Sequence, residues 1–212
     1  MCGIAGLIFT SEQRPVGLDP QHVIQRMIER LRHRGPEATR IKRFNEDRCW
    51  LAHARLRVTD DREIADQPFT SQSSRWKLVF NGEIYNFKDI KKDLEKKNYK
   101  FLTSTDSEII PYAFQEWGID FVKKLTGMFS IALYDKTNNK FYLIRDRVGI
   151  KPLFFSHLND AMIFSSEPKA IINFPGFEKK INLSAIYSYL SFRYPTNNNE
   201  FFFQNIHKVN PG

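Results

Sequence analysis

The chain has 212 residues, 42% of them apolar, which is enough for one large domain or two small ones with a hydrophobic core. No apolar run approaches the roughly 20 residues of a membrane span, and the first residues lack the basic segment of a signal peptide. Two cysteines are too few for a disulfide framework. We therefore expect a cytoplasmic protein that contacts no membrane. The net charge of +8 comes from scattered basic residues without a zinc-ligand spacing or an RNA-binding aromatic motif, so we also expect no nucleic-acid partner.

The first part of the chain alternates strand and helix signals. Residues 2–9 are apolar and interrupted by glycine, as in a strand that is buried on both faces. Asp19-Pro20 begins a predicted helix that Gly35-Pro36 must end. Residues 50–58 and 75–80 are strand candidates, and the Asn81-Gly82 pair after the second predicts a tight turn. The apolar residues of the helix fall on one side, at Val23, Ile24, Met27, Ile28 and Leu31.

The second part of the chain contains two helix signals followed by hairpins. The helices cover about 87–97 and 105–117, and Ser104, Thr105 or Asp106 is the candidate N-cap of the second. Residues 128–135 and 140–146 predict a hairpin, 151–156 and 161–166 repeat this pattern, and 184–191 are helical. Because strands pair locally while helices cluster elsewhere, the sequence predicts an α+β fold with mainly antiparallel sheets.

Cys2 is a candidate nucleophile. If Met1 is removed, Cys2 carries a thiol together with a free α-amino group, whose ordinary pKa of about 7.7–8 suits a general base near neutral pH. If Met1 stays, the same residue is a small buried apolar side chain near a strand start. Cys49, within an apolar strand-like run, is interpreted as an inert core thiol.

Three other groups of residues offer what acyl transfer from an amino acid needs. Asn81 and Gly82 can form an oxyanion hole, from the side-chain amide and from a backbone N–H without an obstructing Cβ. Arg55 offers a planar fork for a carboxylate, and Asp106, assisted by Glu83, can hold an ammonium group. Each has a structural alternative: a turn for the Asn-Gly pair, a surface cation for Arg55 and a helix cap for Asp106.

These stretches belong to a longer ordered series: MCGIAGLI, RHRGPE, LAHARLRV, QPF, FNGEIYNF, STDSEII, LTGMFSIALYD, RDRVGIKPLFF and SSEPKAI. The series resembles the class II glutamine amidotransferases, which are N-terminal nucleophile hydrolases that release ammonia from glutamine, over residues 2 to about 172. The wording of RHRGP, H-x-R-L, FNGEIYN and the segment after RD is most similar to the glutaminase domain of glutamine-hydrolysing asparagine synthetases. The resemblance implies a four-layer αββα sandwich of two mainly antiparallel sheets.

The resemblance also implies a role for each candidate residue. Cys2, freed of Met1, would form a γ-glutamyl thioester with its α-amine as base, and Asn81 and Gly82 would form the oxyanion hole. Arg55 would bind the glutamine α-carboxylate, and Asp106 and Glu83 would surround its α-amino group. Neighbouring pocket contacts would come from Leu56, Arg57, Val58 and Thr59.

The sequence departs from the family pattern near this pocket. Arg57 stands where the family usually has a small serine, Thr59 where an aliphatic residue is common, and the connector TDDREIADQPF is more acidic than usual. These departures leave the chemistry intact and bear on glutamine affinity and pocket closure.

Residues 1–172 are expected to be the glutaminase domain, and 173–212 an extension that leads towards a synthetase domain. No SGGxDS-type pyrophosphate loop occurs in these residues, so no cofactor is expected here, and ATP and Mg would serve only that further domain. The expected partners are L-glutamine and the synthetase domain, and the resemblance allows a homodimer. The alternative is a non-catalytic scaffold or regulatory domain of the same fold that retains Met1.

Overall fold

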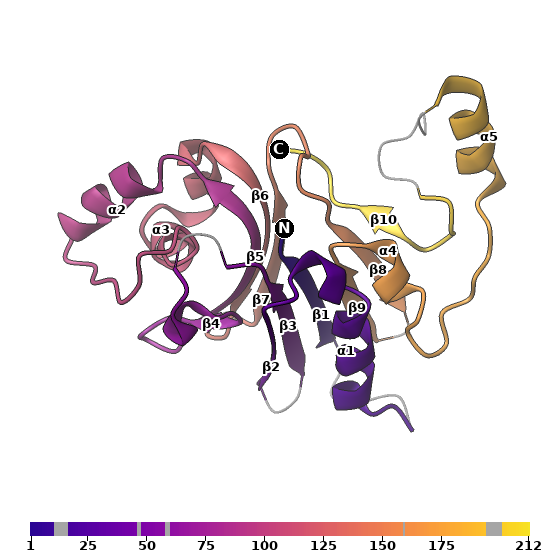
Figure 1. Cartoon of the computed structure of the whole chain (residues 1–212), viewed down its shortest axis with the longest axis horizontal. Coiled ribbons are helices and arrows are strands. Elements are labelled where there is room, and N and C mark those ends of the chain that lie inside the picture. Colours follow the sequence, from indigo (N-terminus) through magenta and orange to yellow (C-terminus); the bar gives the residue numbers. More distant parts are fainter. Residues whose placement is uncertain (11–16, 46–47, 58–59, 159, 194–200) are drawn as a thin grey trace.

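A computed structural model describes residues 1–212 except 11–16, 46–47, 58–59, 159 and 194–200. Two antiparallel sheets lie face to face at its centre, and helices cover their outer faces (Figure 1). Sheet A, the larger of the two, has the strand order β10 (His207–Lys208), β8 (Phe154–Leu158), β9 (Ala161–Ser165), β1 (Gly3–Phe9), β3 (Cys49–Arg55) and β2 (Ala38–Phe44). Sheet B has the strand order β4 (Phe69–Thr70), β5 (Trp76–Ile84), β6 (Gly127–Asp135) and β7 (Lys140–Arg145).

The helices are short, and most of them form the two outer layers. Sheet A is covered by α1 (Pro20–Glu29) and α4 (Pro168–Ile171), and sheet B by α2 (Phe87–Glu95) and α3 (Ile109–Trp117). The remaining helix, α5 (Leu183–Phe192), stands at the end of the molecule opposite α2 (Figure 1). In the described part of the chain, short 3₁₀ helices connect these elements: η1 (Arg32–Arg34), η2 (Glu63–Ala65) and η3 (Gly118–Lys124).

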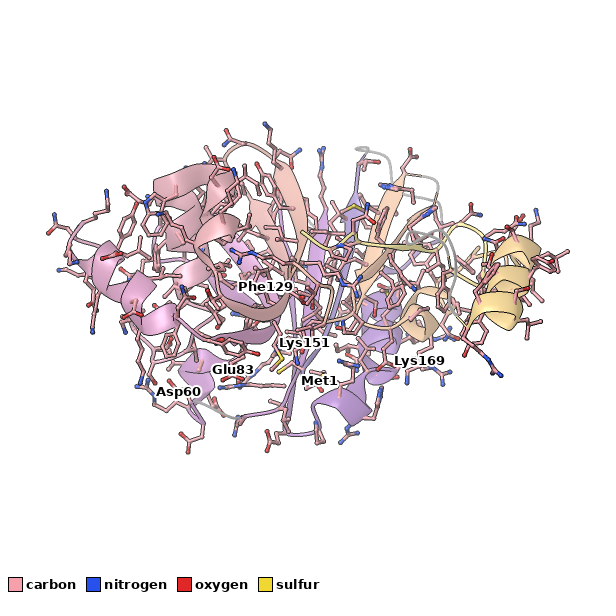
Figure 2. All side chains as sticks on the ribbon, turned by 90° about the horizontal axis from the view of Figure 1, so that it is seen from above. Met1, Asp60, Glu83, Phe129, Lys151 and Lys169 are labelled. Carbon is pink, nitrogen blue, oxygen red and sulfur yellow. The ribbon has the colours of Figure 1, made fainter. Side chains whose placement is uncertain are left out.

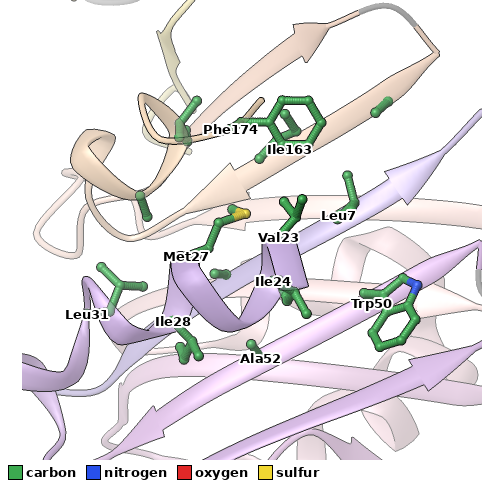
Figure 3. Close-up of a cluster of buried hydrophobic side chains, with 14 of the residues drawn as sticks. Leu7, Val23, Ile24, Met27, Ile28, Leu31, Trp50, Ala52, Ile163 and Phe174 are labelled. Atoms are coloured by element: carbon green, nitrogen blue, oxygen red, sulfur yellow. The ribbon is translucent and has the colours of Figure 1, made fainter. Parts of the chain in front are cut away.

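Among the described residues, three apolar cores hold the four layers together. The central core joins the sheets, with Ile4, Leu51 and Phe164 of sheet A packed against Val79 and Tyr134 of sheet B. The second core lies between sheet A and α1 (Figure 3), and the third lies between sheet B and the helices α2 and α3. The four-layer αββα sandwich implied by the resemblance is therefore confirmed.

Helix α1 follows its sequence signals closely. The Asp19 side chain accepts a hydrogen bond from the Gln21 N–H, and Pro20 occupies the first turn, where its missing N–H costs nothing. The predicted apolar side faces the sheet, with Val23, Ile24, Met27, Ile28 and Leu31 all buried (Figure 3). Complete burial of one such side chain contributes about 1.5–3 kcal/mol relative to exposure.

Both predicted hairpins are confirmed. Strands β6 and β7 pair in the register Leu133↔Tyr142 on either side of residues 136–139, and β8 pairs with β9 in the register Ser156↔Ile163. The predicted helix at 184–191 corresponds to α5. No helix in the described part of the chain is long and apolar enough to span a membrane.

The C-terminal residues return to the sandwich. After α5, strand β10 pairs antiparallel with β8 and adds a short edge to sheet A, in the register His207↔Phe155. The Val209 N–H then donates to the Leu153 carbonyl at 2.9 Å. The predicted domain boundary near residue 172 stays a prediction, and β10 gives the residues beyond it a direct contact with the sheet.

Candidate active site

A cavity of about 210 Å³ opens where the N-terminal end of β1 meets the C-terminal ends of β3 and β5. Because β1 and β3 are antiparallel neighbours, with Gly3 opposite Ala54, the residue before β1 lies beside the residues that end β3. Figure 2 shows Met1, Glu83 and Lys151 close together near the centre of the molecule, and all three line the cavity. The cavity is lined by Met1, Cys2, His53, Arg55, Leu56, Ala65, Gln67, Phe80, Asn81, Gly82, Glu83, Thr105, Asp106, Ser107, Met128 and Lys151.

The Cys2 thiol lies against the backbone that follows β3. The Leu56 N–H donates to Sγ at 3.4 Å, and Sγ lies 3.7 Å from the Leu56 carbonyl oxygen. Burial raises the thiol pKa above its ordinary value, and the Leu56 N–H and the charge of Arg55 offset this only in part. The thiol is therefore protonated at neutral pH, and a reaction through it needs a base.

The backbone of Cys2 is held by a contact that sequence reasoning missed. Arg34 in η1 donates from Nε to the Cys2 carbonyl at 3.1 Å and from Nη1 to Glu167 at 2.8 Å. Glu167 also lies 2.9 Å from His33 and 3.0 Å from Lys169. Burial opposes the charge of Glu167, but its hydrogen bonds to Arg34, Lys169 and His33 outweigh burial and lower its pKa to about 2. The sequence did contain a signal for this contact, because His33 and Arg34 lie in the motif RHRGP and Glu167 and Lys169 lie in the motif SSEPKAI.

Asn81 and Gly82 lie within β5, so the predicted tight turn at this pair is wrong. Asn81 pairs with Ser130 and Gly82 with Phe129 of β6. A Cβ at Gly82 would overlap the Met128 carbonyl oxygen, so glycine here permits the close approach of a neighbouring strand rather than a reversal of the chain. Pairing with a strand distant in sequence decided this conformation.

The donors of this part of β5 face the cavity. Alternate N–H groups of a strand point to the same side; the Phe80 N–H donates to Gln67 Oε1 at 2.6 Å and the Ile84 N–H to Asp106 Oδ2 at 2.8 Å. Gly82 lies between them, so its N–H points away from β6 towards the cavity it lines. Asn81 is 1% exposed, and no described residue accepts a hydrogen bond from its Nδ2 atom.

Asp106 does not cap the following helix, and neither Ser104 nor Thr105 does, contrary to the expectation. Helix α3 begins at Ile109 with Glu108 at its N-cap position, where no side-chain cap bond forms. The Glu108 carboxylate instead accepts from the Leu102 and Thr103 N–H groups. The Asp106 carboxylate accepts a hydrogen bond from the Ile84 N–H of β5.

Asp106 is a second titratable group in the cavity. Burial is the main cause that raises its pKa to about 6, hydrogen bonds from backbone N–H groups work against this rise, and the charge of Glu83 adds to it. Asp106 and Glu83 together bring two carboxyl groups to the lining of the cavity.

Arg55 also lines the cavity and is not a surface cation. Its side chain is 7% exposed, and its guanidinium donates to the Asp66 carboxylate and to the Asp60 carbonyl, with a further bond of 3.1 Å to the Arg62 carbonyl. The next predicted contact, Leu56, lines the cavity. Arg57 does not line it, and Val58 and Thr59 lie outside the described residues.

The sequence also assigned no role to His53, Gln67 and Lys151, which line the cavity. His53 is buried, and burial lowers its pKa to about 4, so the ring is neutral near pH 7 and contacts the Phe80 carbonyl at 3.2 Å. Lys151 is 6% exposed. The motifs LAHARL, QPF and KPLFF contained these residues, but motif membership alone did not tell which side chains face the cavity.

Comparisons with known proteins agree with this architecture. A family model described as a glutamine amidotransferase domain matches residues 1–212. Asparagine synthetase [glutamine-hydrolyzing] 2 of Bacillus subtilis (strain 168) is 36% identical over 216 residues, which are 100% of this chain and 28% of that protein. Asparagine synthetase [glutamine-hydrolyzing] 2 of Oryza sativa subsp. japonica is 37% identical over 172 residues, covering 81% of this chain and 28% of that protein.

Solved structures share the fold at low sequence identity. The glutamine phosphoribosylpyrophosphate amidotransferase from B. subtilis, complexed with ADP and GMP, superposes with a TM-score of 0.66 at 19% identity, covering 81% of this chain and 43% of that one. The chain spans about 28% of the length of the curated relatives it matches. Since the family model covers all of its residues and the sandwich is that of solved amidotransferases, the chain belongs to the glutamine amidotransferase domain family, and its sequence relatives are glutamine-hydrolysing asparagine synthetases.

Proposed function

We propose that this chain hydrolyses L-glutamine to glutamate and ammonia through a thioester on Cys2. One observation carries the proposal: the buried Asn81 amide nitrogen has no acceptor among the described residues and lines the same cavity as the Cys2 thiol. A buried donor without a partner costs about 1–3 kcal/mol. An oxyanion that forms on the substrate would give this donor an acceptor.

The proposed reaction has two steps. After Met1 is removed, the Cys2 α-amine takes the thiol proton and Sγ attacks the side-chain amide carbon of glutamine. The Asn81 amide and the Gly82 N–H stabilise the negative oxygen, the carbon–nitrogen bond breaks, and ammonia leaves with the proton from the α-amine. Water then attacks the thioester carbon, releases glutamate and restores the thiol.

Substrate binding in this proposal uses charged side chains that line the cavity. Arg55 binds the glutamine α-carboxylate, and Asp106 and Glu83 bind its α-ammonium group. Leu56 contributes a neighbouring contact, and Val58 and Thr59 remain predicted contributors to the pocket, whereas Arg57 does not line it.

The ammonia would serve an ATP-dependent synthetase domain outside these 212 residues. In this proposal that domain alone uses ATP and Mg, since the sequence contains no SGGxDS-type loop. The names of the relatives, asparagine synthetases, support asparagine as the product of that domain. A homodimer remains a prediction.

Hydroxylamine trapping tests the thioester. Hydroxylamine attacks a γ-glutamyl thioester at the same carbon as water, so protein lacking Met1, incubated with glutamine and hydroxylamine, should yield γ-glutamyl hydroxamate above the enzyme-free background. Mass spectrometry would measure both the product and the state of the N-terminus. The same chain with Met1 retained should yield none. Absence of glutamate and hydroxamate from protein lacking Met1 would favour the non-catalytic scaffold instead.

Glutamine binding should weaken on acidification because of Asp106. The pKa of about 6 means that its carboxylate is ionised above that pH and protonated below it. In a Cys2→Ala variant, which binds without turnover, the glutamine Kd should rise by up to about tenfold per pH unit below pH 6. Calorimetry would measure this rise, and Asp106→Asn should bind weakly with little pH dependence. A Kd that stays constant from neutral pH to about pH 5 would contradict this role.

A further inference from the structure

The Arg55 fork already holds a carboxylate of the same chain. Nη1 donates to Asp66 Oδ1 and to the Arg62 carbonyl, and Nη2 donates to the Asp60 carbonyl. All three acceptors belong to residues 60–66, which follow β3 and contain the short helix η2. An internal anion is therefore bound to the side chain that we propose for the substrate carboxylate.

Asp66 is shared among three arginines. Its Oδ1 atom contacts Arg55, whereas its Oδ2 atom lies 3.2 Å from Nε of Arg40 and 3.7 Å from Nη2 of Arg57. The Asp66 side chain is 4% exposed. Burial opposes its ionised form, but hydrogen bonds and charge from the arginines outweigh burial, and the pKa of Asp66 lies below its ordinary value. Asp66 is thus a carboxylate at neutral pH.

Arg57 has an unused donor on the outer side of Asp66. Its Nε atom is buried, and no described residue accepts a hydrogen bond from it. The Arg57 backbone N–H is bound by Glu37, which anchors the residue independently of its side chain. Arg57 therefore has a donor left without a partner among the described residues, while its Nη2 atom lies 3.7 Å from Asp66 Oδ2.

We propose that Asp66 competes with the glutamine α-carboxylate for Arg55, and that Arg57 retains Asp66 when glutamine displaces it. This inference rests on the proposed role of Arg55. Two carboxylates that share one guanidinium repel each other, so binding of glutamine to Arg55 requires that Asp66 be displaced or tolerated. Arg57 and the acidic connector, two of the three departures from the family pattern, then act together to set the affinity for glutamine.

The first test is Asp66→Asn in the full chain, because asparagine keeps the shape of the side chain and removes its charge. We expect the KM for glutamine to fall about tenfold at an unchanged kcat. The KM for L-glutaminamide, in which a neutral amide replaces the α-carboxylate, should not change. Asp93→Asn is the matched control, since Asp93 pairs with Lys96 at 2.9 Å on an exposed face of α2, and it should leave both KM values as they are.

The second test is Arg57→Ser, which removes the outer partner of Asp66. Asp66 is then left to Arg55 and Arg40, so the KM for glutamine should rise. In the Asp66→Asn background the same change should have little effect, and this non-additivity measures the coupling of the pair. Unfolding midpoints would verify that each variant is folded, and Asp66→Ser serves as the second variant if Asp66→Asn does not fold.

The outcomes separate this inference from the proposed function. An unchanged or higher KM for glutamine in Asp66→Asn would mean that Asp66 positions Arg55 for the substrate, which overturns the competition while leaving glutaminase activity in place. Equal shifts for glutamine and L-glutaminamide would also overturn it, because the effect would not depend on the α-carboxylate. Absence of any glutaminase activity in the parent chain without Met1 would instead overturn the proposed function.

Discussion

Replacing Cys2 with alanine is expected to reduce glutamate release from glutamine to the background of the assay. The proposed thioester needs a nucleophile, and alanine keeps the α-amine while it removes the sulfur. Loss of a covalent nucleophile from an amide hydrolase costs on the order of a millionfold in kcat. A coupled glutamate assay would measure the loss, and calorimetry should find glutamine binding retained, because the binding groups of the cavity come from other residues.

Cys49→Ala is the matched control for this prediction. Cys49 is the second cysteine of the chain and lies 1% exposed in the core between the sheets. Burial raises its pKa far above the ordinary value, so it is an inert thiol near neutral pH. Glutaminase activity should survive in this variant. Activity that survives in Cys2→Ala would exclude the thioester mechanism.

Asn81→Ala should have the second largest effect, a fall of about 100- to 1000-fold in kcat, which is the usual cost of one oxyanion-hole donor. The KM for glutamine should change much less, since the ground-state amide carries little negative charge. Because Nδ2 has no acceptor in the described part of the chain, its removal should not cost the free energy of a folded-state hydrogen bond. Steady-state kinetics and a thermal unfolding midpoint would measure the two effects separately.

An equal loss of kcat and of folded protein in Asn81→Ala would point to a structural role for the side chain. Asn173→Ala is a suitable control, because the Asn173 side chain donates to the Lys169 carbonyl on the exposed face of the molecule. That variant should keep its kcat. A kcat loss at Asn81 below tenfold would argue against the proposed oxyanion hole.

The elements that the sequence predicted well are those decided by neighbours in sequence. Helix α1 follows from the Asp19 cap, Pro20 and a one-sided apolar pattern, and the β6–β7 hairpin follows from two apolar runs around residues 136–139. In both cases the residues that decide the conformation are close to each other in the sequence. Propensity and periodicity report on such short-range interactions.

The elements that the sequence predicted wrongly depend on distant partners. Asn81-Gly82 has the composition of a turn, but pairing with Ser130 and Phe129 of β6 extends it as strand. The residues before α3 have the composition of an N-cap, but the Asp106 carboxylate binds the Ile84 N–H of β5 instead. In each case a hydrogen-bond partner more than 20 residues away outweighed a weak local preference.

By itself the sequence determined the family resemblance, the α+β sandwich and the set of chemical groups: a thiol behind Met1, an amide, a guanidinium and carboxylates. The tertiary structure alone decided how these groups meet, because antiparallel pairing of β1 with β3 brings Cys2 beside Leu56. The tertiary structure also decided that the Asp66 carboxylate binds the Arg55 guanidinium. That contact has no signature in composition or spacing, since the free energy of an ion pair depends on burial and on the position of every neighbouring charge.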